Sequence, residues 1–146
     1  VEYLLKADGC LPKGLVSIPV TAPMRLPIDI KNCIQKFTKE SSDVVITVTD
    51  SHRNPYFNMV SIGDDGLVKI VVPPTKNIHR RQDAKLVYDV TTIAYVVSPQ
   101  FIMQSESLFG GKVRSVFVPK ERSIDIDTLF DFEIAEFLMN KRMGSN

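Results

Sequence analysis

Two aspartates near the end of the sequence have the residue type and the spacing of a cation site. They belong to the run Arg122-Ser123-Ile124-Asp125-Ile126-Asp127. Side chains alternate along an extended chain, so Asp125 and Asp127 would share one face and the two isoleucines the other. Carboxylate oxygens are the ligands that Mg²⁺ prefers. A simpler interpretation stays open, in which Asp127 caps the following helix and Asp125 is a solvated loop acid.

Adjacent arginines in residues 79–83 (His-Arg-Arg-Gln-Asp) form a second candidate group. A guanidinium group can bind a carboxylate or a phosphate through two parallel hydrogen bonds. The alternative is a solvated charge cluster. His52 and His79 have no Cys or carboxylate partner at the spacing of a zinc site, which indicates loop histidines. The run Gly110-Gly111-Lys112 lacks the frame of a phosphate-binding loop, and we predict a turn there.

The composition is that of one globular domain. The chain has 146 residues, 44% of them hydrophobic and 24% charged, with a formal net charge of +1. This balance excludes the polycationic surface of a nucleic-acid clamp, and no apolar run reaches the length of a membrane span. Without a secretory signal, Cys10 and Cys33 are predicted to be buried thiols in a reducing compartment, the cytoplasm. The sequence begins at Val1, which hints at a processed or truncated protein.

Strands and helices are expected to alternate along the chain. Branched apolar runs predict strands at residues 14–20, 43–49, 90–97 and 113–118, and a short extended piece at 123–127. Helices are predicted from Pro27 to about residue 42, at 99–105, and after a cap at Asp127 or Thr128. This alternation favours a single α/β domain with a mostly parallel sheet.

A hairpin interrupts this alternation. Two extended runs, 56–62 and 67–72, flank the pair Asp65-Gly66, which is a strong hairpin signal. We expect the hairpin to project as an arm spanning about residues 52–83. Its apolar residues are too many for a hairpin left in water, so a second subunit is expected to cover them. They are Tyr56, Phe57, Met59, Val60 and Ile62.

Several of these runs, between about Leu15 and Met139, resemble the CMP-sugar-acid synthetases, the family of the acylneuraminate cytidylyltransferases. The most specific is the run from Arg122 to Asp127, followed by Leu129, Asp131 and Ala135-Glu136. The supporting runs are Thr21-Ala22-Pro23-Met24-Arg25, Arg80-Arg81-Gln82-Asp83 and Leu108-Phe109-Gly110-Gly111.

The resemblance implies a Rossmann-like nucleotidyltransferase fold in three α/β/α layers, and a homodimer built on the hairpin arm. It implies Mg²⁺-dependent transfer of CMP from CTP to the anomeric hydroxyl of a nine-carbon 2-keto sugar acid, a step in making cell-surface polysaccharides. Asp125 and Asp127 would hold the metal. Arg80, Arg81 and Gln82 would line the sugar-acid site, and Arg25 and Thr91 would lie near the substrate pocket.

The sequence departs from the family pattern in ways that leave alternatives open. It contains nothing like the family's R-x-G-S-K…K-N loop for the CTP phosphates, and Pro19 stands where sialic acid synthetases carry a glutamine. The run Thr91-Thr92-Ile93-Ala94-Tyr95 replaces Asn-Gly-Ala-Ile-Tyr. The alternatives are a synthetase for an eight-carbon 2-keto sugar acid and a non-catalytic fragment that dimerises through its arm.

Overall fold

A computed structural model describes residues 6, 9–74, 78 and 80–144. The chain divides into two compact units, and each is described by itself. Residues 50–89 form one unit, and the chain on either side of them forms the other. His79, one of the two predicted loop histidines, lies outside the described residues, whereas His52 is exposed in an irregular segment.

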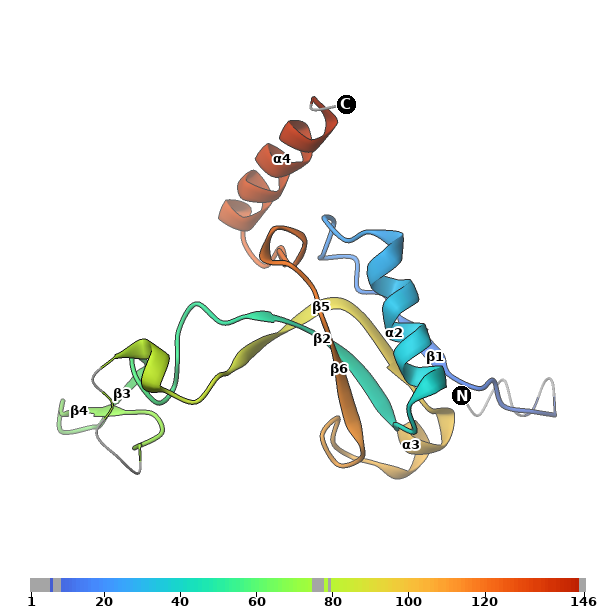
Figure 1. The fold of residues 1–146 in the computed structure, drawn as a ribbon, viewed down its shortest axis with the longest axis horizontal. Helices are drawn as coiled ribbons and strands as arrows, with labels where there is room; N and C mark the ends of the chain where they lie inside the picture. Colours follow the sequence, from blue (N-terminus) through green and yellow to red (C-terminus); the bar gives the residue numbers. More distant parts are fainter. Residues whose placement is uncertain (1–5, 7–8, 75–77, 79, 145–146) are drawn as a thin grey trace. The chain divides into compact units, whose positions relative to one another are not determined.

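A four-stranded sheet organises the larger unit (Figure 1). Its order is β1 (Leu15–Ser17), β5 (Tyr88–Val97), β2 (Val44–Asp50) and β6 (Val113–Phe117). β2 and β6 run parallel, with Val44 opposite Val113, whereas β1 runs antiparallel to β5. The expectation of a mostly parallel sheet is therefore met at β2–β6 and not at β1–β5, and the α/β class is confirmed.

The helix α2 (Pro27–Lys39) covers one face of this sheet. The first backbone N–H group of a helix has no partner within the helix. Proline lacks this group, so Pro27 suits the start of α2. Cys33 of α2 packs in a buried cluster with Val45, Ala94 and Val96. Alternate residues of β2 point the other way, where Val44, Ile46 and Val48 form a second cluster that includes Phe101 of the short helix α3 (Pro99–Gln104). The three-layer arrangement stays a prediction.

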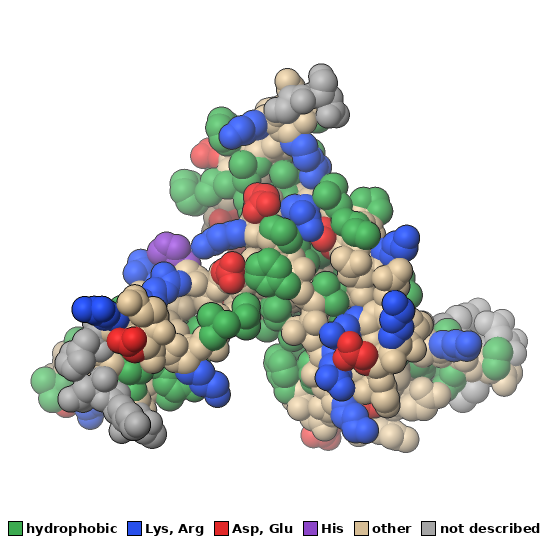
Figure 2. All heavy atoms as spheres, viewed as in Figure 1, with side chains coloured by type: hydrophobic (Ala, Val, Ile, Leu, Met, Phe, Trp, Pro, Cys, Tyr) green, Lys and Arg blue, Asp and Glu red, His purple; other side chains and the backbone are tan. Residues whose placement is uncertain are grey.

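The last helix, α4 (Leu129–Met143), begins at a capping box. The Thr128 hydroxyl accepts from the Asp131 amide, and the Asp131 carboxylate accepts from the Thr128 amide. Ala135 is its one buried residue among those described, whereas Leu129, Phe130 and Phe137 are each at least two-thirds exposed. Hydrophobic side chains are visible on the outer surface of this helix (Figure 2). No described helix is long and apolar enough to cross a membrane.

The smaller unit contains the predicted hairpin. β3 (Val60–Ile62) pairs antiparallel with β4 (Val68–Ile70), and Gly66 takes a left-handed φ of 75° in the turn between them. The first extended run is shorter than expected, because the Asn54 carbonyl accepts the amides of residues 57, 58 and 59 and closes a turn there. A short 3₁₀ helix, η1 (Arg81–Asp83), follows. The projection of this hairpin as an arm of a single domain stays a prediction.

Two further expectations need correction. Residues 123–127 form no strand; they follow the 3₁₀ helix η2 (Lys120–Arg122) as irregular chain. Cys33 is buried as predicted, but Cys10 is exposed, because it lies in a bend outside the helices and strands that form the core. Both thiols are free. The run at 110–112 is a turn region, as predicted, with the Gly110 amide bonded to the Ser107 carbonyl.

Candidate functional site

The two candidate metal ligands lie in the irregular segment between η2 and α4. Asp125 is half-buried, and its Oδ1 atom is buried without a hydrogen-bond partner among the described residues. Asp127 is exposed, and Thr128 rather than Asp127 caps α4. The simpler interpretation therefore does not hold for Asp127, whose side chain is not the helix cap, and Asp125 keeps one carboxylate oxygen buried while the residue as a whole is half-buried.

Two ionisable neighbours sense the charge of Asp125. Burial lowers the pKa of the Arg25 guanidinium, and the negative charge of Asp125 opposes that shift. Burial raises the pKa of the Tyr95 phenol, and the Asp125 charge raises it further. The structure therefore brings Arg25, Tyr95 and Asp125 into one electrostatic neighbourhood. Arg25 and Asp125 are predicted site residues, whereas Tyr95 is known from the sequence only as the end of the run at residues 91–95.

Arg25 directs its guanidinium toward backbone carbonyls. Nε donates to Ala22 (2.7 Å), Nη1 donates to Ile93 of β5 (3.2 Å), and Nη2 donates to Pro19. These bonds close the turn that follows β1 and fasten it to β5. Arg25 thus stabilises the turn after β1. Its predicted contact with the substrate stays a prediction.

Thr91 is part of a buried pair of hydroxyl groups between β5 and β2. Its Oγ1 donates to Thr47 Oγ1 (2.8 Å), which in turn lies 3.1 Å from the Thr91 carbonyl. Both threonines are at least 94% buried. The Thr91 hydroxyl therefore has its hydrogen-bond partner, Thr47, on the neighbouring strand β2. Its predicted role in substrate binding stays a prediction.

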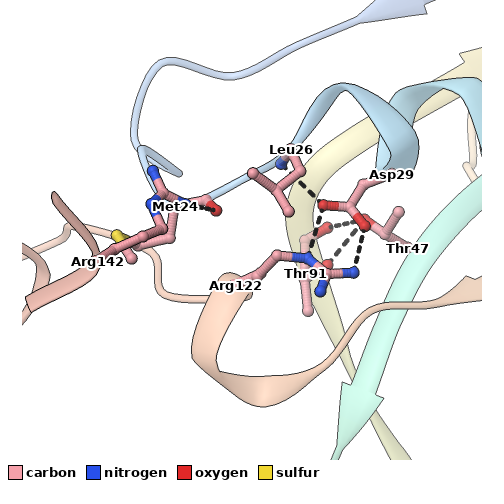
Figure 3. A network of polar contacts seen from close by, with 7 residues as sticks. All are labelled: Met24, Leu26, Asp29, Thr47, Thr91, Arg122 and Arg142. Atoms are coloured by element: carbon pink, nitrogen blue, oxygen red, sulfur yellow. Dashed lines mark hydrogen bonds and ion pairs between the residues drawn. The ribbon is translucent and has the colours of Figure 1, made fainter. Parts of the chain in front are cut away.

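A buried ion pair holds the start of the acidic segment (Figure 3). The Asp29 carboxylate, 2% exposed, binds the Arg122 guanidinium through two hydrogen bonds: Nη2 to Oδ1 is 2.8 Å and Nε to Oδ2 is 3.1 Å. Asp29 Oδ2 also accepts the Leu26 amide at the start of α2. The hydrogen bond to Asp29 raises the pKa of Arg122. Sequence reasoning missed Asp29, because residue 29 lies 93 positions from its partner and also resembles an ordinary acid in a first helical turn.

The smaller unit brings Arg81 and Gln82 into one cavity of about 290 Å³. Arg81 Nη2 donates to the Ser51 carbonyl (2.6 Å), which fixes one end of the guanidinium. Arg53 and Asn54 also line this cavity, and sequence reasoning missed both. The buried Asn54 side chain donates to the Lys85 carbonyl (2.9 Å), which ties the two walls together. Arg80, the third predicted residue, is exposed at the start of η1 and is not part of the lining.

The carboxylates fit a magnesium ion by their chemistry. Mg²⁺ in phosphate-transfer sites is commonly bound by one or two carboxylates, with water and substrate phosphate completing its octahedron. A buried carboxylate oxygen that lacks a partner suits such a cation, because leaving it unpaired is costly. The described residues contain no cluster of three or more His, Cys, Asp or Glu ligands, so the rest of the shell would have to come from elsewhere.

The fold and these residues define an α/β protein whose acidic segment follows its last strand. No protein-family model matches the chain. It is similar to the post-translational flagellin modification protein B of Campylobacter coli, with 30% identity over 97% of this chain and 60% of that protein. It is 32% identical to a CMP-N,N'-diacetyllegionaminic acid synthase of Campylobacter jejuni, over 66% of this chain and 40% of that protein.

A third relative is an N-acylneuraminate cytidylyltransferase of Streptococcus agalactiae, 25% identical over 80% of this chain and 28% of that protein. These similarities support the CMP-sugar-acid synthetase family that the motifs predicted. The chain spans 60% or less of the length of each of these relatives.

Proposed function

We propose that this chain is the cytidylyltransferase part of an enzyme that activates a nonulosonic, sialic-acid-like 2-keto sugar acid. The anomeric hydroxyl would attack the α-phosphorus of CTP. A new P–O bond would form, the hydroxyl proton would be lost to solvent, and the bond to pyrophosphate would break. The names of two relatives, which refer to a CMP-sugar-acid synthase and to a cytidylyltransferase, support this reaction class.

The observation that carries the proposal is the buried, unpartnered Oδ1 of Asp125 within the family's most specific motif. Asp125 and Asp127 would hold Mg²⁺, which supplies neutralisation of phosphate charge when bound. Arg25 and Arg122 keep the surrounding backbone in place through the bonds described above. Phosphoryl transfer depends mainly on such positioning and on electrostatics, because the protein itself forms no covalent intermediate.

Substrate binding is proposed for the basic cavity in the smaller unit. Its lining includes Arg53, Arg81, Gln82, Asn54 and Asp50, so it offers two guanidinium groups and two amides beside one carboxylate. A sugar carboxylate is a planar, two-oxygen anion that matches a guanidinium group. A homodimer through the hairpin is proposed on the exposure of its apolar residues, of which Val60 is 53% and Ile62 is 71% exposed.

Pyrophosphate release from CTP tests the reaction. The 146-residue chain is incubated with CTP, Mg²⁺ and, in turn, N-acetylneuraminate, a legionaminic acid and an eight-carbon 2-keto sugar acid. Release that requires one of the nine-carbon acids would support the proposal, and release with the eight-carbon acid would favour the related synthetase. A folded chain that releases no pyrophosphate with any acid would favour the alternative of a non-catalytic fragment. The chain spans only 60% of the first relative, which is why this alternative is included in the test.

A further inference from the structure

The Asp29–Arg122 ion pair joins two parts of the chain whose positions matter to the proposed metal site. Asp29 lies in the first turn of α2, and Arg122 ends η2, three residues before Asp125. The pair is bidentate and is nearly closed to solvent on the aspartate side, where the side chain is 2% exposed against 24% for the arginine. Such a geometry restricts orientation more than a single-contact surface pair does.

A second contact holds the far side of the same segment. The Ile126 amide donates to the Thr21 carbonyl (2.8 Å). The turn that carries Thr21 is in turn fastened by Arg25 to Pro19, Ala22 and Ile93. Asp125 therefore lies between two anchors, the side chain of Arg122 and the backbone of Ile126. Its backbone has no strand ladder of its own to position it, since residues 123–126 are irregular.

We propose that Asp29 and Arg122 are positioning residues, which hold the segment 123–127 so that Asp125 and Asp127 present their carboxylates to one cation. The inference rests on the proposed function for the identity of that cation. Its physical basis is that ligands on irregular chain are precise only when neighbouring contacts restrain them. Neither residue needs to contact the metal or the substrate in order to act in this way.

A pair of neutral substitutions separates positioning from folding. Arg122→Gln by itself would leave the buried Asp29 charge without its partner, which is strongly destabilising. The double variant Asp29→Asn/Arg122→Gln removes both charges, and the asparagine keeps an oxygen for the Leu26 amide. Arg114→Gln is the matched control, because Arg114 forms an exposed ion pair with Glu40 at the other end of α2 (3.3 Å).

Two measurements are made on the complete chain: Mn²⁺ affinity by electron paramagnetic resonance, and native-state amide hydrogen exchange. The double variant is expected to bind Mn²⁺ about tenfold more weakly, the lower end of the usual effect of supporting contacts. Its Ile126 amide is expected to exchange at least tenfold faster, whereas amides within β2 keep their wild-type rates. Arg122→Lys, which retains the charge but loses the planar fork, should fall between. Arg114→Gln should match the wild type in both measurements.

The outcomes distinguish this inference from the proposed function. Wild-type Mn²⁺ affinity and Ile126 exchange in the double variant would overturn the positioning role. Equal acceleration of exchange across Ile126 and β2 would overturn it as well, because that pattern describes a general loss of stability. If the wild-type chain binds no Mn²⁺ while Ile126 exchange responds as expected, the metal assignment fails and the restraint of the segment stands.

Discussion

At the scale of single residues, the buried Oδ1 of Asp125 is the feature with the clearest cost in folding free energy. A carboxylate oxygen removed from water needs a hydrogen-bond donor or a cation, and Asp125 Oδ1 has no donor among the described residues. Asp127 lies two positions away, so a second negative charge is close in sequence. Two nearby carboxylates repel each other when no cation is bound.

Replacing either aspartate by asparagine should therefore separate stability from cation binding. Asp125→Asn and Asp127→Asn are each expected to hold or slightly raise the melting temperature in metal-free buffer. Both should lose the additional stabilisation that Mg²⁺ with CTP gives the wild type, measured by thermal melts. Asp64→Asn in the hairpin turn is the charge control and should keep that stabilisation. Retention of the full Mg²⁺ and CTP effect in both variants would remove the metal assignment.

Arg81 should matter to the sugar acid more than to the fold. Arg81→Ala removes a guanidinium that lines the basic cavity, and hydrogen bonds to a charged ligand group are commonly worth about tenfold or more in affinity. We expect the dissociation constant for N-acetylneuraminate, measured by calorimetry, to rise by about that factor, with the far-UV circular dichroism unchanged. Arg114→Ala is the matched control, because Arg114 is an exposed arginine that does not line the cavity. Equal affinities of the wild type and Arg81→Ala for the sugar acid would contradict a binding role for Arg81 and would favour the alternative of a solvated charge cluster.

At the scale of elements, α4 depends on its cap because it buries so little. The hydrogen bond from the Thr128 hydroxyl is the main cause that lowers the pKa of Asp131 below its ordinary value of 3.8. An acid whose folded pKa is lowered stabilises the fold above its unfolded pKa, and that contribution is lost as the pH falls through the folded pKa. The capping box is therefore complete at neutral pH and weakens in acid.

Thr128→Ala should lower the midpoint of thermal unfolding by about 3 °C at pH 7, the usual effect of a lost N-cap. The difference from the wild type should narrow as the pH falls below 3.8, because protonated Asp131 stabilises the wild-type cap less. Circular dichroism at several pH values measures both effects. Thr128→Ser, which keeps the hydroxyl, is the control. A difference that stays constant from pH 7 to pH 3 would contradict the role given to Asp131.

Local patterns predicted most elements, and long-range pairing accounts for what they missed. The branched run after Asp43 predicts β2, which is buried on both faces, and the apolar spacing around Cys33 predicts α2, which buries one face. Three contacts join distant positions: the bidentate pair of Asp29 with Arg122, the bond from Arg25 to the Ile93 carbonyl, and the hydroxyl pair of Thr91 with Thr47. No spacing rule connects residues 44 to 93 positions apart, so these contacts became visible in the folded chain.

The acidic segment shows the same limit within five residues. The alternation of Asp and Ile predicted an extended strand at 123–127, but strand geometry requires a neighbour to supply hydrogen bonds. Here η2 ends at Arg122, and Ile126 finds one partner, the Thr21 carbonyl. The motif predicts which residues carry the chemistry, and that stays a prediction, while the segment that holds them is an anchored loop.

At the scale of the whole molecule, the apolar hairpin predicts association between copies. Met59, Val60 and Ile62 are 41%, 53% and 71% exposed, and such a surface on a short hairpin is unfavourable in water. We expect sedimentation velocity to show a dimer at micromolar concentration. Ile62→Lys should shift the chain toward monomer, whereas Val20→Lys, at a 92% exposed position in the larger unit, should not. A wild-type monomer at these concentrations would contradict a dimer built on the hairpin.

The two thiols differ in exposure, so their labelling rates can report motion of the helix α2. Cys10 is exposed, whereas burial, aided by the charge of Asp29, raises the pKa of Cys33 to about 11. A thiol reacts as its thiolate, so a maleimide dye at pH 7 should label Cys10 within minutes and leave Cys33 unlabelled. Slow modification of Cys33 would then report each opening of α2 from the sheet. In the Cys10→Ser variant, the rate at which the same reagent modifies Cys33, measured by mass spectrometry, gives the rate of that opening.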